Sequence, residues 1–477
     1  MKKIILTFVL LISSLVQSQE IINTLDINDF EIDDVRYFDT YNIKKDSSLV
    51  SIFLIKNDLF AYNYELTSTA FGKPFVYKKL KNKYGQIVGH APHKNGHTLF
   101  LNSYNEKWFY LYFNFNDQNV SLEQFDLRLK SEVILNSFSN DHSHYILTIK
   151  KNSSTLILHK LNTDGTQESN YYDFSSIDFS EGLRSISNLY QFIKAGAGTF
   201  QTDIISQDYP MSMRSSNDKV KIYRKNGTLI ITVDNSTNFT YILELNKEKE
   251  KTSYKIISKN SLNEESSFTD SNSFLFENNL FIIKSSFKEI NFSIVNLTNS
   301  QKIGTYKTKD IFFNNVQLIS KNKRNKNQQE IISRKEYLKE IVNSKPAIYV
   351  ERSGDNYTAS IGSLKGDSGE YRMECITVPT GLGFGATIRK IPKSNTFDND
   401  FLDFSRIERV YSKMVLDPSF NHISEAREES GLLKRIRNYL NTNNYNGLEV
   451  LNIINREFYL SRINPDTKRL EIRVFKN

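Results

Sequence analysis

A repeated pattern of short strands is the sequence feature that most constrains the fold. Between Gly96 and Leu127, two apolar-aromatic strands are joined by a polar turn, and an apolar residue followed by asparagine closes the second strand. The same pattern returns at 145–162, 229–246, 280–296 and 458–464. The closing asparagines at positions 116, 162, 246 and 296 are 46, 84 and 50 residues apart, and 84 is twice 42.

Repeats of about 40–50 residues that each supply about four strands are typical of a β-propeller. Further closing positions fall near residues 67, 363, 417 and 464, which gives eight in all, and a ninth is inferred inside the 84-residue step. Because propellers typically have about four to eight blades, at least one of these positions is false. We therefore predict an all-β fold, a β-propeller of about seven or eight blades.

The length of the chain supports a repeat that shares its core between neighbours. At 477 residues it exceeds the length at which a single core stops growing, which is about 250–300 residues. We predict a single propeller domain over residues 19–477, with helical insertions at about 321–343 and 424–441, where apolar residues follow a helical spacing. The segment Asp26–Asp39 is expected to add a strand to the last blade and so remove the open edge. Leu189–Ile193 is expected to form a strand.

The N-terminus has the pattern of a secretion signal. Lys2 and Lys3 precede an apolar stretch, Ile4–Val16, which is too short to span a membrane. Cleavage is expected after Ser18, so that residues 1–18 form a signal peptide and the mature protein is periplasmic or extracellular. No other apolar run could cross a membrane, and no oligomeric state is indicated.

The single cysteine and the scattered charge argue against a disulfide-stabilised fold and against a nucleic-acid-binding protein. Cys375 has no partner for a disulfide within the chain, and its strand-like surroundings predict a buried free thiol. The formal charge of +8 comes from scattered lysines, which predicts a solvated basic surface and no nucleic-acid partner. Aromatic residues make up 13% of the chain, which suits half-buried sheet surfaces.

The ending Glu457–Phe475, the short hairpins and the signal peptide together resemble secreted β-propeller proteins of Gram-negative bacteria. The resemblance is one of pattern and covers most of residues 45–310 and 345–477. It implies the propeller fold and export. It carries no functional residues, because no Trp-Asp, kelch or Asp-box motif occurs.

Histidines form the cluster whose spacing is closest to that of metal ligands. The candidates occur in two neighbouring units of the repeat: His90, His93, His97, His142 and His144. Equivalent turns of successive blades meet on one face, so these imidazoles could bind Zn²⁺ or Cu²⁺. Pro92 and the turn at 94–96 place the first three on a loop, and the alternative is that all are exposed turn residues.

Three other motifs match known sites only in part. Gly366–Gly369 matches the nucleophile string of trypsin-like proteases without its continuation or a base, so a hairpin turn is favoured. Gly381–Gly385 lacks the rest of a phosphate-binding loop and favours a tight turn. Asp398, Asp400 and Asp403 could supply oxygen ligands to Ca²⁺ but lack the EF-hand order, so a solvated loop is favoured.

No catalytic constellation is assigned, and no cofactor is indicated. The leading hypothesis is a secreted, non-enzymatic binding or scaffold propeller that recognises a protein or glycan. The alternative is a polysaccharide-active hydrolase or lyase, with carboxylates and histidines from several blades at the central channel. Fold alone cannot separate the two hypotheses.

Overall fold

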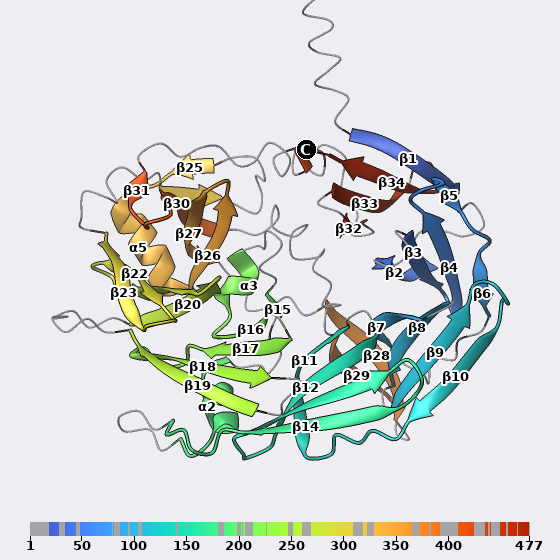
Figure 1. Ribbon diagram of the computed structural model, residues 1–477, viewed down its shortest axis with the longest axis horizontal. Coiled ribbons are helices and arrows are strands. Elements are labelled where there is room, and N and C mark those ends of the chain that lie inside the picture. The colour runs from blue at the N-terminus through green and yellow to red at the C-terminus, as the bar shows by residue number, and fades with distance from the viewer. Residues whose placement is uncertain are drawn as a thin grey trace, which may run out of the picture.

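The computed structural model describes residues 19–27, 34–43, 48–78, 80, 86–93, 96–103, 107–139, 142–179, 186–197, 202, 204–205, 213–225, 227–246, 251–259, 269–308, 318–321, 329–364, 372–380, 383–391, 409–423, 435–436, 439, 449–454, 457–464 and 466–476. Their strands form seven sheets of four to six strands and one two-stranded hairpin. The sheets follow one another in chain order around a common centre (Figure 1). The fold is a seven-bladed β-propeller, which confirms the predicted fold class.

The first three blades have four or five strands each. Blade 1 consists of β2 (Val35–Ile43), β3 (Ser48–Ile55), β4 (Asp58–Glu65), β5 (Ala70–Phe71) and β6 (Phe75–Tyr77). Blade 2 consists of β7 (Gln86–His93), β8 (Gly96–Asn102), β9 (Trp108–Asn114) and β10 (Val120–Phe125). Blade 3 consists of β11 (Glu132–Ser139), β12 (Ser143–Lys150), β13 (Thr155–Asn162) and β14 (Gln167–Asp173).

Blades 4 and 5 continue the pattern after two short helices. The helices are α2 (Leu189–Ala197) and α3 (Met213–Asn217). Blade 4 consists of β15 (Ile204–Ile205), β16 (Val220–Lys225), β17 (Thr228–Val233), β18 (Phe239–Asn246) and β19 (Lys251–Ser258), with β15 parallel to β16. Blade 5 consists of β20 (Asp270–Phe276), β21 (Asn279–Ser285), β22 (Ile290–Asn296) and β23 (Gln301–Lys307).

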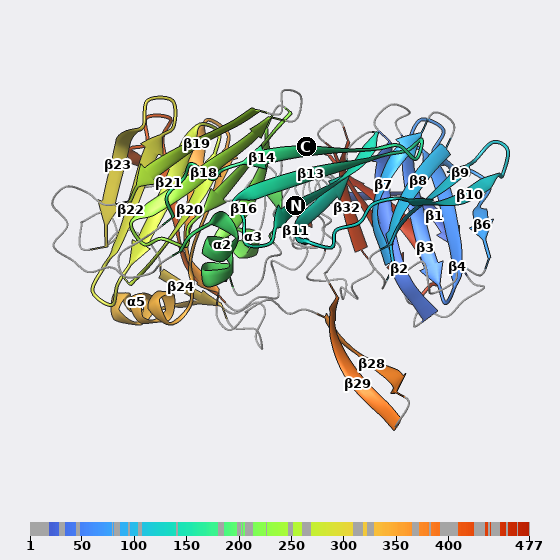
Figure 2. The same cartoon turned by 90° about the horizontal axis from the view of Figure 1, so that it is seen from below.

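Blade 6 is the irregular one. It consists of β24 (Leu318–Lys321), β25 (Gln329–Ile331), β26 (Pro346–Ser353), β27 (Asn356–Leu364), β30 (Arg409–Leu416) and β31 (His422–Ile423). Helix α5 (Arg334–Asn343) precedes β26 and begins at an N-cap, Ser333, whose side chain accepts from the Glu336 N–H. Between β27 and β30 the chain forms a hairpin, β28 (Arg372–Thr380) and β29 (Gly383–Ile391), which stands away from the ring (Figure 2).

Blade 7 joins the two ends of the chain. It consists of β1 (Gln19–Asp26), β32 (Glu449–Ile454), β33 (Glu457–Asn464) and β34 (Arg469–Phe475). β1 pairs with β34 from Gln19 opposite Phe475 to Asp26 opposite Arg469. The predicted closure of the last blade is therefore present, but the strand that makes it lies just before the segment named in the prediction. Val35–Ile43 is instead the innermost strand of blade 1.

Neighbouring blades share hydrophobic cores, as the chain length required. Leu59 of blade 1 packs in one core with Leu111 of blade 2, and Ile55 of blade 1 packs in another with Leu470 of blade 7. The middle strand β12 is buried over nearly its whole length because it is covered on both faces, whereas the outermost strand β14 is mostly exposed. Gly165 lies in the turn between β13 and β14, where its φ of +84° favours glycine.

Two of the predicted repeat units are wrong, and their loss leaves seven blades. The closings near 363 and 417 belong to one sheet, because β27 pairs directly with β30, with Ser363 opposite Val410. The 84-residue step holds helices in place of a blade: Leu189–Ile193 lies in α2 and not in a strand. The step is therefore filled by helical connections, which the strand pattern could not anticipate.

The remaining predictions about segments have mixed outcomes. Of the first helical insertion, Arg334–Asn343 is helical, whereas its described residues Lys321 and Gln329–Ile331 lie in β24 and β25. Cys375 lies in β28 opposite Ile388. Most of the second insertion lies outside the described residues. So do the signal peptide, Gly366–Gly369, the first two residues of the Gly381–Gly385 motif, and the loop with Asp398, Asp400 and Asp403. Across the described ranges, no helix has the length and apolar character that a bilayer crossing needs.

Candidate functional site

The five candidate histidines lie in two neighbouring blades. Strands β7, β8 and β12 hold four of them and the fifth precedes β12: His90, His93, His97, His144 and His142. The loop expected for the first three is wrong, because they lie in paired strands in which Pro92 is opposite His97. β7 is the innermost strand of its blade, so the missing N–H of Pro92 can face away from the ladder.

All five lie at one rim of the propeller. His90 is near the end of the first strand of blade 2, and His97 begins the second; His144 likewise begins the second strand of blade 3. We call this end, where a turn joins the first strand of each blade to the second, the first-turn rim. Equivalent turns of adjacent blades therefore meet on one face, as the repeat predicted.

Three of the histidines are brought together. The rings of His90 and His97 are stacked, with centroids 5.2 Å apart and planes inclined by 12°. His144 packs against the backbone beside His90: a Cβ placed on Gly89 would lie 2.2 Å from the Nδ1 of His144. Only glycine at position 89 lets the strands of the two blades approach so closely.

The other two histidines lie outside this group. His93 is exposed and packs edge-to-face with Tyr112, with ring centroids 4.7 Å apart. His142 is exposed just before β12. Nitrogen lone pairs lie in the ring plane, so the nearly parallel rings of His90 and His97 do not point their nitrogens at one ion. Among the residues described, no three His, Cys, Asp or Glu side chains are arranged to hold a metal ion. The alternative that all five are exposed turn residues is wrong for His97 and His144, which are fully buried. Metal binding stays an untested alternative, and a test of it follows in the Discussion.

Blade 1 completes the group with residues that the sequence did not single out. Tyr41 stacks on His90 with ring centroids 3.4 Å apart. Its hydroxyl contacts that of Tyr37, which donates to the Oδ2 of Asp39 at 3.0 Å. Asp39 is buried, and burial raises its pKa to about 7. We call Asp39, Tyr41, His90, His97 and His144 the histidine cluster.

The imidazoles of the histidine cluster are neutral at neutral pH and are not fully hydrogen-bonded. Burial lowers the pKa of His97 and of His144 to about 3, and it lowers that of His90, helped by the other two histidines. Both nitrogens of His97, Nδ1 of His90 and Nε2 of His144 have no hydrogen-bond partner among the described residues. A buried polar atom left unpaired costs about 1–3 kcal/mol. These nitrogens are unpaired within that part of the chain but lie below the surface, and the half-buried His90 is the member of the cluster nearest to solvent.

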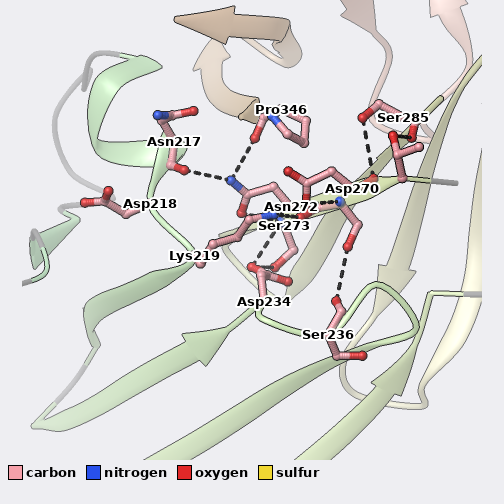
Figure 3. Close-up of polar contacts among 12 residues, drawn as sticks. Asn217, Asp218, Lys219, Asp234, Ser236, Asp270, Asn272, Ser273, Ser285 and Pro346 are labelled. Atoms are coloured by element: carbon pink, nitrogen blue, oxygen red, sulfur yellow. Dashed lines mark hydrogen bonds and ion pairs between the residues drawn. The ribbon is translucent and has the colours of Figure 1, made fainter. Parts of the chain in front are cut away.

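A second buried polar group lies at the opposite rim, in blades 4 to 6 (Figure 3). At its centre is Asp234, which directly follows β17 of blade 4 and is fully buried. Its carboxylate pairs with Lys259 at 2.9 Å and Lys221 at 3.2 Å, both also fully buried. It further accepts from the hydroxyls of Thr240 and Ser273, each at 2.7 Å.

The network extends into blades 5 and 6 through Asn272 of β20. Its Oδ1 accepts from Lys221 at 2.6 Å, and its Nδ2 donates to the carbonyl of Pro346 at 2.8 Å. Lys219 pairs with Asp270, beside Asn272. We call Lys219, Lys221, Asp234, Lys259, Asp270 and Asn272 the lysine–aspartate network. It joins three blades at the rim opposite the histidine cluster.

The charges of this network compensate one another. Burial tends to raise the pKa of Asp234, but Lys259 and Lys221 hold it below its ordinary value, so the carboxylate stays ionised. Burial lowers the pKa of Lys259 to about 8. Because every charged atom at its centre has several partners, the network acts as a brace between blades. No sequence motif marks the network, since its members are up to 53 residues apart, from Lys219 to Asn272.

Comparisons with known proteins leave the family open. The chain matches no protein-family model and no curated protein. Among solved structures it is similar to the WD40 domain of SCAP from fission yeast, at 10% identity over 95% of this chain and 97% of that chain, with a TM-score of 0.32. It is also similar to Kluyveromyces lactis Hsv2, at 9% identity over 70% of this chain and 74% of that chain, with a TM-score of 0.27. At such TM-scores these likenesses add nothing to the sheet topology, which by itself identifies the fold as a seven-bladed propeller.

Proposed function

We propose that this chain is a secreted binding or scaffold propeller that recognises a protein or glycan without converting it. The ligand engages the first-turn rim at blades 1 to 3, where the histidine cluster lies. His90 is the member that a ligand reaches first, because it is half-buried on the innermost strand whereas His97 and His144 are fully buried.

One observation carries this proposal: three neutral imidazoles from two blades meet, and four of their ring nitrogens have no partner within the described part of the chain. A neutral imidazole offers one donor and one acceptor, as sugar hydroxyls and peptide groups also do. Binding that fills these positions recovers the free energy that the unpaired nitrogens cost the free protein. His90 is the part of the cluster that a sugar ring or side chain would contact, because it is half-buried whereas Tyr41 is buried and stacked against it.

Export is part of the proposal. The two lysines and the apolar stretch Ile4–Val16 support a cleaved signal peptide and a periplasmic or extracellular location. We expect the mature protein to begin at Gln19. N-terminal sequencing of the exported protein tests this, and retention of Met1 on exported protein would refute it.

The alternative function is polysaccharide hydrolysis or elimination, and one observation favours it. Burial raises the pKa of Asp39 to about 7. Asp39 is on the same innermost strand as Tyr41, whose ring is stacked on His90 of the adjacent blade. A carboxyl group with a raised pKa can act as a general acid at neutral pH. Asp39 and His90 are the residues that such an activity would use.

A glycan microarray with the purified full-length chain tests the proposal, followed by titration of each hit. His90→Ala should weaken binding at least about tenfold, which is about 1.4 kcal/mol. His93→Ala, three residues along the same strand and exposed, is the matched control and should bind as the wild type does. Equal binding by wild type and His90→Ala would reject the first-turn rim as the binding site.

The same hits separate binding from catalysis. Each bound oligosaccharide is incubated with the wild type and with Asp39→Asn, and new reducing ends and unsaturated products are measured. A binding propeller leaves the ligand intact in both cases. Product release by the wild type that is lost in Asp39→Asn would establish the alternative.

A further inference from the structure

Blade 3 contains a second array of hydrogen-bonded side chains, made of residues outside the histidine cluster. Ser169 of β14 lies opposite His159 of β13, and its Oγ is 2.8 Å from the Nδ1 of His159. The Nε2 of the same imidazole is 2.7 Å from the Oε2 of Glu132 in β11. Serine, imidazole and carboxylate therefore form one line across the blade, from its outermost strand to its innermost.

The carboxylate sets which imidazole nitrogen carries the proton. Burial tends to raise the pKa of Glu132, but hydrogen bonds from His159 and Thr148 bring it below its ordinary value, so Glu132 is ionised. An ionised carboxylate only accepts, so the Nε2 of His159 must donate to it. The Nδ1 then presents a lone pair and accepts the hydroxyl proton of Ser169.

The array is buried at one end and open at the other. The side chains of His159 and Glu132 are 5% and 11% exposed. Ser169 is half-buried on the outermost strand. A reagent can therefore reach the hydroxyl, while water is largely excluded from the groups behind it.

We propose that Ser169 is a nucleophile that accepts an acyl group from an ester, with His159 as its general base and Glu132 as the residue that positions the imidazole. A serine hydroxyl is a weak nucleophile until a positioned base takes its proton, and this is the arrangement that supplies one. The inference goes beyond ligand binding and does not depend on it, since the two sites share no residue.

The step balances without a further reactant. The Oγ of Ser169 forms a bond to the ester carbonyl carbon while its proton passes to the Nδ1 of His159. The ester C–O bond then breaks, the alcohol leaves with that proton, and Ser169 carries the acyl group. Glu132 stays ionised and accepts the hydrogen bond from the Nε2–H of His159 throughout.

The next blade offers a matched control for this array. Ser253 of β19 has the same place in blade 4, on the outermost strand and opposite a residue of the neighbouring strand β18. Its hydroxyl donates directly to the carboxylate of Glu244 at 2.6 Å. Ser253 has a carboxylate partner where Ser169 has an imidazole, so the two serines differ in whether a neutral base accepts the proton.

The test is covalent labelling of the purified full-length chain with a fluorophosphonate, with the modified residue mapped by mass spectrometry. We expect an adduct on Ser169, no labelling in Ser169→Ala, and unchanged labelling in Ser253→Ala. His159→Gln should slow labelling at least about a hundredfold, the usual contribution of a general base. Glu132→Gln should give a smaller loss, and release of p-nitrophenolate from p-nitrophenyl acetate should follow the same order.

Thermal melts of each variant keep the result interpretable. If His159→Gln does not fold, the adduct mapped on the wild type and its loss in Ser169→Ala still decide the matter. No labelling of the wild type, labelling of another serine, or equal rates in wild type and folded His159→Gln would overturn the proposal. The array would then serve only to hold the strands of blade 3 together.

Discussion

The histidine cluster and the lysine–aspartate network are both buried polar groups, but they differ in charge and in how many of their polar atoms have hydrogen-bond partners. The network places ionised groups where each has several partners, so removing one leaves others unpaired. The histidine cluster keeps its imidazoles neutral and leaves four nitrogens without partners among the described residues. Within one fold, the satisfied group braces three blades, and the unsatisfied group is where we propose that a ligand gains binding free energy.

The largest expected effect is the loss of Asp234, the centre of the network. Asp234→Ala leaves Lys221 and Lys259 buried without their carboxylate, and breaking such a buried pair typically destabilises by about 3–5 kcal/mol. Urea unfolding measures this. The control is Asp126→Ala, which removes an exposed pair with Arg128 at 3.7 Å and should change stability by less than about 0.5 kcal/mol. Similar values for both variants would contradict the role of the network.

Acid should destabilise the protein through the histidine cluster. The pKa of His97 and of His144 is about 3 when folded, and about 6.5 for histidine in an unfolded chain. Their contribution to stability is thus present above about pH 6.5 and is lost as pH falls towards 3, by up to about 1.4 kcal/mol per histidine and pH unit.

Asp39 acts in the opposite direction. Its pKa is raised to about 7 when folded, so its contribution is present at low pH and is lost as pH rises through 7. The two histidines together outweigh it below pH 6.5. Urea unfolding from pH 7 to 5 measures the slope, which should be shallower in His97→Phe. An unchanged slope in that variant would show that His97 is not buried as a neutral imidazole.

Gly89→Ala tests the close approach of blades 2 and 3 in the histidine cluster. The added methyl would lie 2.2 Å from the His144 ring, which has nowhere to move because it is fully buried. Overpacking of this kind costs about 1–3 kcal/mol. The control is Gly72→Ala, whose nearest contact would be 3.5 Å and ordinary. Thermal melts should show a lower Tm only for Gly89→Ala, and equal Tm values would mean that the blades are further apart.

The smallest expected effect is that of added metal. Because the rings of His90 and His97 are stacked, we expect stoichiometric Zn²⁺ to leave the Tm unchanged in the wild type and in the His90→Ala/His93→Ala double variant. A site that bound the ion would stabilise the fold by about 2.7 kcal/mol at a hundred times its Kd. A rise in Tm that is absent from the double variant would establish the metal site. The histidine cluster would then resemble the lysine–aspartate network in having partners for its buried polar atoms.

The sequence by itself determined the repeat, the strand pattern and the closure of the ring, because each depends on local periodicity and turn residues. The unit at 145–162 shows this: its two-strand pattern predicted a hairpin that the structure contains as β12 and β13. Periodicity failed where connections broke the repeat, as with α2 in the long step and the pairing of β27 with β30 in blade 6.

Only the tertiary structure decided which polar side chains meet. The repeat brought His90, His97 and His144 to one rim, but it could not show that His93 and His142 stay outside or that Asp39 and Tyr41 of another blade join them. The lysine–aspartate network and the Ser169–His159 pair were equally invisible. The physical reason is that strand periodicity fixes the face of a side chain within its own sheet, whereas burial, pairing and pKa depend on the neighbouring blade packed against that face.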